Sequence, residues 1–278
     1  MHHNLDEVAK YEQQWNEMTI TSDPMFGMVM ENKEICIQLI QRALPHLQLK
    51  EIVNIETQKD VGNVAAKKVR YDVYVLDKDN RIFIIEMQIT DRKNLPFRLR
   101  YYLGQIDQEL LKPNDDYRVL AKYPTYVIMF CNFDYYNLGL ARYEFEMRCT
   151  NKLGLKFGDK RTIIIFNATA KEFSKSDIPI KSFLALMNNQ VDNKSKFIRQ
   201  IQTEIANIKE NPERRRGYMK FQTLLADAKY EGKVEEREKA IAILVKSLKD
   251  VKISDEDIKA KLRENYDLSD KEADKYLQ

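Results

Sequence analysis

Two carboxylates and a carboxamide share one face of a predicted β-hairpin, and these are the side chains most suited to chemistry. The hairpin strands span residues 68–76 and 82–89, and they carry Asp72 and Glu86 respectively. Strand side chains alternate between the two faces of a sheet, so Glu86 and Gln88 project to the same side. The residues between and beside them are apolar, and the polar pair therefore stands out from its surroundings.

The predicted turn fixes how the two strands are aligned. A three-residue loop with Asn80 in the left-handed region closes the hairpin well when Asp77 faces Arg81. This register places Asp72 directly opposite Glu86. Two carboxylates at short range disfavour joint ionisation unless a cation lies between them. Oxygen ligands of this kind suit a hard ion such as Mg²⁺ or Mn²⁺.

A purely structural interpretation of the same residues is also open. Asp72 then faces Arg70 or Lys68 at the edge of a sheet, and Glu86 is a charged cross-strand neighbour. The flanking sequence Ile-Ile-Glu-Met-Gln-Ile favours the metal site. A carboxylate among such apolar residues is costly unless it is paired or bound to a metal.

The elements around the hairpin predict an α/β domain with a mixed sheet. Capping residues indicate helix starts at Asp23, as N-cap before Pro24, and at Asn32. Apolar spacing predicts a helix over 97–111, and continuous apolar runs predict strands covered on both faces. The other expected elements are a strand at 52–58, a turn at 60–63, and the covered strands at 125–131 and 162–166.

From about residue 192 the patterning becomes helical throughout, which predicts an α/β domain at 1–190 and a charged helical region at 191–278. Its main helix, 233–248, has a wide apolar stripe that must pack on something. Either the two short helices that follow cover the stripe, or the stripe forms a homodimer. The stripe consists of Ile241, Leu244, Val245 and Leu248.

Composition excludes several classes of site. The three cysteines are far apart and two of the three histidines are His2 and His3, so neither a zinc cluster nor a histidine-centred site is expected. A net charge of +3 permits nucleic-acid binding without requiring it. No run approaches the roughly 18 apolar residues of a membrane span, and no apolar signal region is evident. We therefore expect a cytoplasmic protein that does not bind membranes.

Asp72 followed by Glu86-Met-Gln88, on a hairpin with a helix on either side, resembles the PD-(D/E)XK nuclease superfamily. The sequence is most similar to its transposase-like branch, the Rpn recombination-promoting nucleases, over roughly residues 20–170. The superfamily usually has Lys where this chain has Gln88, although Gln is common in this branch. Further segments that resemble the branch are Asp23-Pro-Met-Phe26, Glu31-Asn-Lys-Glu34, Leu95-Pro-Phe-Arg98, Tyr101-Tyr102 and Asp116-Tyr117.

The resemblance implies a restriction-endonuclease-like core, a mixed sheet flanked by helices, with an all-helical C-terminal tail. It also implies that Asp72, Glu86 and the carbonyl of Met87 hold Mg²⁺ or Mn²⁺, which activates a water for attack on phosphorus. Gln88 has no charge and cannot act as a base, so it would position the water or the phosphate by hydrogen bonds. Glu34 is a further acid that the preceding helix would supply, as in some relatives.

The sequence thus predicts a Mg²⁺-dependent DNA endonuclease of the transposase-like type, acting in recombination of mobile elements or in genome defence. One alternative is a catalytically inactive DNA-binding relative, because Gln88 replaces Lys. Another is an interaction protein that oligomerises through its tail, with the nuclease-like domain as scaffold. Four basic residues beside the site either line a track for phosphates or belong to a solvated surface: Arg92, Lys93, Arg98 and Arg100.

Overall fold

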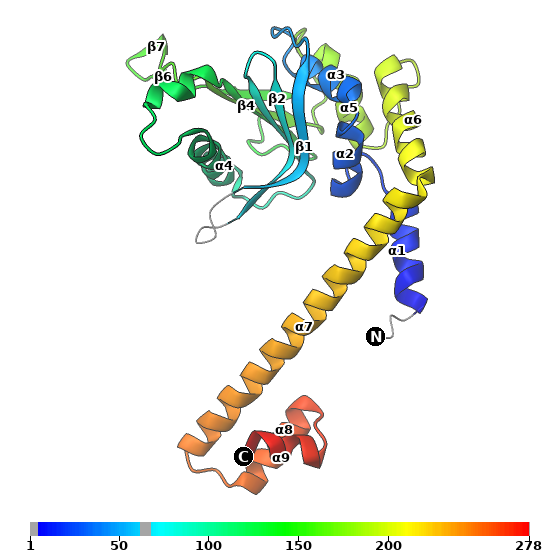
Figure 1. Ribbon diagram of the computed structural model, residues 1–278, viewed down its shortest axis with the longest axis vertical. Coiled ribbons are helices and arrows are strands. Elements are labelled where there is room, and N and C mark those ends of the chain that lie inside the picture. Colours follow the sequence, from blue (N-terminus) through cyan, green and yellow to red (C-terminus); the bar gives the residue numbers. More distant parts are fainter. Residues whose placement is uncertain (1–4, 62–67, 278) are drawn as a thin grey trace. The chain divides into compact units, whose positions relative to one another are not determined.

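The computed structural model describes residues 5–61 and 68–277, which divide into two compact units. The larger unit spans Gln13–Pro212, and the smaller combines the chain up to Glu12 with Glu213 onwards. Figure 1 shows the sheet of the larger unit between its helices. Among the described residues, no helix has both the length and the apolar character needed to cross a membrane.

The described part of the larger unit contains a mixed six-stranded sheet, in the order β1-β2-β3-β4-β8-β5. The strands β3, β4 and β8 are parallel, whereas β1–β2, β2–β3 and β5–β8 pair antiparallel. A separate hairpin consists of β6 and β7. The strands are β1 (Ile52–Val61), β2 (Val69–Asp77), β3 (Ile82–Gln88), β4 (Thr125–Cys131), β5 (Arg142–Phe145), β6 (Arg148–Cys149), β7 (Lys152–Lys156) and β8 (Arg161–Asn167).

Helices cover both faces of this sheet, as the apolar runs in β3, β4 and β8 require. On one face α4 packs its apolar stripe on Ile82, Ile84 and Val127. On the other face the ring of Phe130 lies 4.9 Å from that of Phe183 in α5 (Figure 1). The helices of this unit include α2 (Asp23–Met30), α3 (Lys33–Ala43), α4 (Leu95–Leu110), the 3₁₀ turn η1 (Tyr117–Lys122), α5 (Ile178–Met187) and α6 (Lys196–Glu210).

The turns and caps follow from local sequence, with one correction. Asn80 adopts φ 58° between β2 and β3, as predicted, and Asn32 caps α3 by accepting a hydrogen bond from the Ile35 N–H. The N-cap of α2 is Ser22, so the prediction of Asp23 was wrong by one residue. Asp23 instead lies in the first turn of α2, where its negative charge suits the helix dipole.

Some predicted boundaries also shift. Strand β1 continues through Asp60 and Val61, because these residues pair with β2. The rest of the turn predicted at 60–63 lies outside the described residues. Helix α6 packs against α2 and α3 in the larger unit, although the sequence assigns it to the helical tail. The division of the chain after residue 190 therefore stays a prediction.

The smaller unit contains α7 (Pro212–Asp250), a helix of 39 residues, followed by α8 (Asp255–Tyr266) and α9 (Asp270–Leu277). Both short helices lie beside the C-terminal end of α7 (Figure 1). Ser254 caps α8 by accepting from the Asp257 N–H, and Ser269 bonds Glu272 at the start of α9. Ile241 and Val245 are buried against the two short helices, with Leu244 and Leu248 packed beside them. The apolar stripe is thus covered within the chain and gives no argument for a second copy.

Because the stripe is covered, we expect two nearby isoleucines of α7 to differ sharply in how much their truncation to alanine destabilises the packing. Ile241 is 1% exposed and Ile243 is 67% exposed. We expect Ile241→Ala to destabilise the packing of α7, α8 and α9 by about 2–4 kcal/mol, because it leaves a cavity. Ile243→Ala, the matched control, should cost less than about 0.5 kcal/mol. Hydrogen exchange of the amides in 241–262 measures both, and equal protection in the two variants would contradict this packing.

Candidate active site

The hairpin of β2 and β3 brings the two predicted carboxylates together. The ladder pairs Leu76 with Ile82 and ends with Val73 opposite Ile85, so the same register places Asp72 opposite Glu86. Beyond Val73 and Ile85, hydrogen bonds from backbone N–H groups to the two carboxylates join the strands. The Asp72 N–H donates to Oε1 of Glu86 at 3.0 Å, and the Met87 N–H donates to Oδ2 of Asp72 at 3.1 Å. Each carboxylate is therefore fixed by the backbone of the opposite strand.

Burial makes this pair electrostatically unfavourable. Glu86 is 3% exposed, and its burial, followed by repulsion from Asp72, raises its pKa well above the ordinary value. Burial also raises the pKa of Asp72 to about 6, although the hydrogen bond from Met87 opposes this shift. Asp23, in the first turn of α2, adds further repulsion to both groups. The pair thus binds protons readily, and a divalent cation would relieve the same excess of negative charge.

The donor set fits a small hard cation. Asp72 and Glu86 supply carboxylate oxygens, which Mg²⁺ and Mn²⁺ prefer. The Met87 N–H donates to Asp72, and the carbonyl of a residue in a regular antiparallel strand lies on the same side of the strand as its N–H, which for Met87 is the side of β2. Within residues 5–61 and 68–277, no group of three or more His, Cys, Asp or Glu side chains is arranged to hold a metal. Any metal here would depend on two carboxylates, a carbonyl and water.

Gln88 lies two residues beyond Glu86 on the same face of β3. Its amide nitrogen donates to the carbonyl of Thr90 at 2.8 Å. Its Oε1 is buried and accepts no hydrogen bond from the residues that the structure describes. An unsatisfied buried oxygen is costly, and it is an acceptor available to a water or another donor. The position of Gln88 agrees with the predicted role, which stays a prediction.

Among the four basic residues predicted beside the site, Arg98 alone contacts the carboxylates in the described structure. It extends from α4, and its Nη2 lies 3.7 Å from Oε2 of Glu86. Arg92 and Arg100 are exposed, and Lys93 pairs with Asp91. The structure therefore places Arg98 at the carboxylates, whereas the sequence did not distinguish among the four basic residues.

Two other residues near the pair were missed. Gln58 lies opposite Asp72 on β1, where its Nε2 is 3.5 Å from Oδ1 of Asp72, and it has the unusual φ of 52°. A non-glycine residue in this region of backbone space is a strained feature that clusters at functional sites. Asp23 was assigned only a capping role. The other acid considered, Glu34, accepts hydrogen bonds from Gln38 and Gln200 instead.

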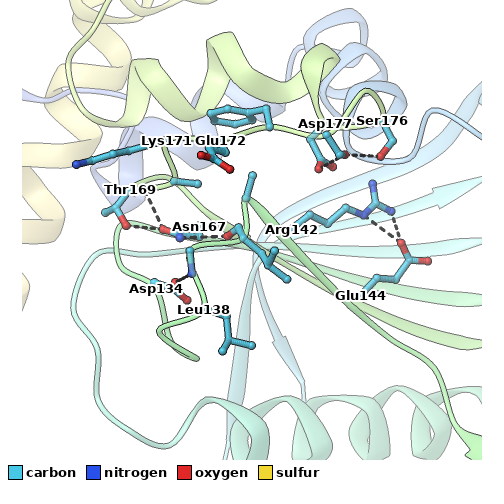
Figure 2. A pocket seen from close by; sticks show the side chains of 16 residues that line it. Asp134, Leu138, Arg142, Glu144, Asn167, Thr169, Lys171, Glu172, Ser176 and Asp177 are labelled. Atoms are coloured by element: carbon cyan, nitrogen blue, oxygen red, sulfur yellow. Dashed lines mark hydrogen bonds and ion pairs between the residues drawn. The ribbon is translucent and has the colours of Figure 1, made fainter.

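A cavity of about 900 Å³ lies elsewhere in the larger unit, beside the ends of β5 and β8. Figure 2 shows that its polar residues mostly bond one another: Asn167 accepts from Thr169, and Arg142 pairs with Glu144. None of Asp72, Glu86, Gln88 or Arg98 lines it. The carboxylate pair is therefore not part of this cavity.

Comparison with known proteins identifies the family. The family model described as PD-(D/E)XK nuclease family transposase matches residues 24–236, which include the carboxylate hairpin and α4. No curated protein and no solved structure matches the chain. The predicted restriction-endonuclease-like fold is confirmed, with its mixed sheet, flanking helices and C-terminal helices. The chain belongs to the PD-(D/E)XK nuclease family transposases.

Proposed function

We propose that this protein is a metal-dependent DNA endonuclease that hydrolyses phosphodiester bonds at Asp72 and Glu86. The family implies a nuclease, and PD-(D/E)XK nucleases generally depend on divalent metals. The observation that carries the proposal is the pair of buried carboxylates, which two backbone N–H groups hold side by side although both pKa values are raised. A structural role would be served by a neutral pair at lower cost.

In this mechanism Asp72, Glu86 and the Met87 carbonyl would hold Mg²⁺ or Mn²⁺, while the N–H groups of Asp72 and Met87 fix the two carboxylates. When bound, the ion would supply charge stabilisation at the phosphate and a lowered pKa of the attacking water. Gln88 orients that water or a phosphate oxygen by hydrogen bonds, since a carboxamide cannot accept a proton as a base. The β2–β3 backbone therefore sets the geometry before substrate arrives.

Supercoiled plasmid distinguishes the enzyme from its alternatives. We expect purified protein to nick plasmid in the presence of Mg²⁺ or Mn²⁺, with EDTA and Asp72→Ala abolishing the reaction. A catalytically inactive DNA-binding relative, which the uncharged Gln88 favours, would shift plasmid in a gel without cutting it. If the protein neither cuts nor binds DNA, the proposal is wrong and a scaffold function remains.

Gln88 should affect the rate without affecting metal binding. We expect Gln88→Ala to slow cleavage by about 10–10²-fold, because a positioning hydrogen bond is lost at the reacting centre. Gln88→Lys should keep or raise activity, since Lys is the usual residue of the superfamily at this position. Calorimetry with Mn²⁺ should give similar affinities for both variants and the wild type. Loss of activity in Gln88→Lys together with wild-type activity in Gln88→Ala would contradict the assigned role.

A further inference from the structure

Arg98 is a partly buried cation that is only loosely held at the carboxylate pair. Its side chain is 26% exposed, and the 3.7 Å contact with Glu86 is longer than a hydrogen bond. Its other contacts are soft: Nη2 donates to Sδ of Met129 at 3.8 Å, and the guanidinium lies 5.5 Å from the ring centroid of Tyr102. Its Nε is buried and lacks a hydrogen-bond partner among the described residues. Arg98 therefore has hydrogen-bonding capacity that the protein itself does not use.

A positive charge besides the metal would stabilise the charge that develops on a phosphodiester at this site, and Gln88 does not provide one. We propose that Arg98 supplies this charge by binding the scissile phosphate, which makes it a catalytic residue supplied by α4 rather than by β3. This inference rests on the proposed endonuclease function. A guanidinium presents several N–H donors in a planar fork that matches phosphate oxygens, and it stays charged at all working pH values.

The other basic residues of this region are less suitable. Lys93 is exposed and pairs with Asp91 at 2.5 Å. Arg100 follows Arg98 by two residues on α4, and residues at this spacing do not face the same side of a helix. Arg100 is accordingly exposed. It therefore provides a matched control, with the same charge on the same helix but away from the carboxylates.

Without metal, the loose contact with Glu86 partly neutralises the carboxylates, and Arg98 lowers the pKa of both Asp72 and Glu86. A divalent cation held by the carboxylates would take over this neutralisation and would repel the guanidinium. The contact with Glu86, at 3.7 Å, is loose enough to be given up. The guanidinium, whose Nε has no partner among the described residues, can then donate to a phosphate oxygen.

The decisive experiment compares Arg98→Ala, Arg98→Lys and Arg100→Ala in plasmid cleavage. We expect Arg98→Ala to slow cleavage by about 10²–10³-fold, as loss of a group that stabilises transition-state charge does. Arg98→Lys should lose less, because it keeps the charge but not the fork. Arg100→Ala should stay within about threefold, since exposed charges contribute little. Calorimetry at pH 8.5 should show that Arg98→Ala binds Mn²⁺ at least as tightly as the wild type.

A rescue experiment separates this role from a structural one. Adding Gln88→Lys to Arg98→Ala restores a cation from β3. We expect the double variant to cut plasmid at least about tenfold faster than Arg98→Ala. Wild-type cleavage by Arg98→Ala, or loss of its Mn²⁺ binding, would overturn the proposal. So would a double variant no faster than Arg98→Ala, with circular dichroism showing that both variants are folded.

Binding measurements keep this test independent of the proposed function. If the wild type does not cut plasmid, the endonuclease proposal fails, and anisotropy with a short DNA duplex in Ca²⁺ still reports on Arg98. We then expect Arg98→Ala to weaken binding several-fold, because a charged hydrogen bond to phosphate is lost, whereas Arg100→Ala changes it little. Equal affinity for the wild type and Arg98→Ala would refute the contact with phosphate.

Discussion

Replacing Glu86 by glutamine should abolish Mn²⁺ binding and slow DNA cleavage by about 10³-fold or more, since a catalytic metal contributes several kcal/mol to the transition state. Glutamine has nearly the same shape, and its carbonyl oxygen can still accept the hydrogen bond from the Asp72 N–H. The backbone arrangement should therefore survive. Only the charge changes, and with it the ability of the pair to bind a divalent cation.

The matched control for this substitution is Glu34→Gln. Glu34 lies on α3, in the same unit, and bonds Gln38 and Gln200. We expect this variant to bind Mn²⁺ and to cut plasmid like the wild type. Isothermal titration calorimetry and the rate of nicking measure both properties. Unchanged Mn²⁺ affinity in Glu86→Gln, or an equal loss in Glu34→Gln, would show that the metal lies elsewhere.

Asp72→Asn should stabilise the metal-free protein at pH 8 while abolishing cleavage. The pKa of Asp72 is about 6 in the folded protein, against about 4 in an unfolded chain. Between these values the unfolded chain has lost a proton that the folded protein retains, so stability falls as the pH rises from about 4 to about 6. Above that range ionised Asp72 lowers the free energy of unfolding by the full amount, about 2–3 kcal/mol. The neutral asparagine removes it and also relieves the repulsion on Glu86.

Thermal unfolding in EDTA measures this effect. For a unit of roughly this size we expect Asp72→Asn to raise the Tm at pH 8 by about 5–10 °C, and by much less at pH 4. Asp60→Asn, at an exposed position near the end of β1, is the control and should change little. Mg²⁺ should stabilise the wild type, by about 2.7 kcal/mol at a hundred times its Kd, but not Asp72→Asn. A lower Tm for Asp72→Asn at pH 8 would show that the ionised carboxylate stabilises the fold.

Local sequence was sufficient to predict the hairpin and its carboxylates. The alternation of side chains in β3 places Glu86 and Gln88 on one face, and the loop with Asn80 sets the register with β2. The apolar run at Thr125–Cys131 forms a strand with those boundaries, because a strand covered on both faces must be apolar throughout. These features depend on neighbours close in the chain, so periodicity and turn geometry determine them.

Weak local patterns hid other elements. The short edge strand β5 has only four residues, which gives too little alternation to recognise. The helix predicted at 233–248 is only part of α7, which runs through residues 212–250 without a break that composition could reveal. The apolar stripe of α7 left two partners open, and the structure packs α8 and α9 on Ile241 and Val245. The homodimer stays a prediction.

The surroundings of the carboxylates also depend on the tertiary structure, because they come from segments that packing brings together. Gln58, Asp23 and Arg98 come from β1, α2 and α4, and they approach Asp72 and Glu86 only after the sheet and its helices have packed. No spacing in the sequence encodes these distances. The sequence by itself determined which groups could bind a cation, because that follows from residue type and strand period. The fold decided how strongly those groups are buried and therefore that their pKa values are raised, since desolvation arises only from packing. It also decided that Arg98 contacts Glu86.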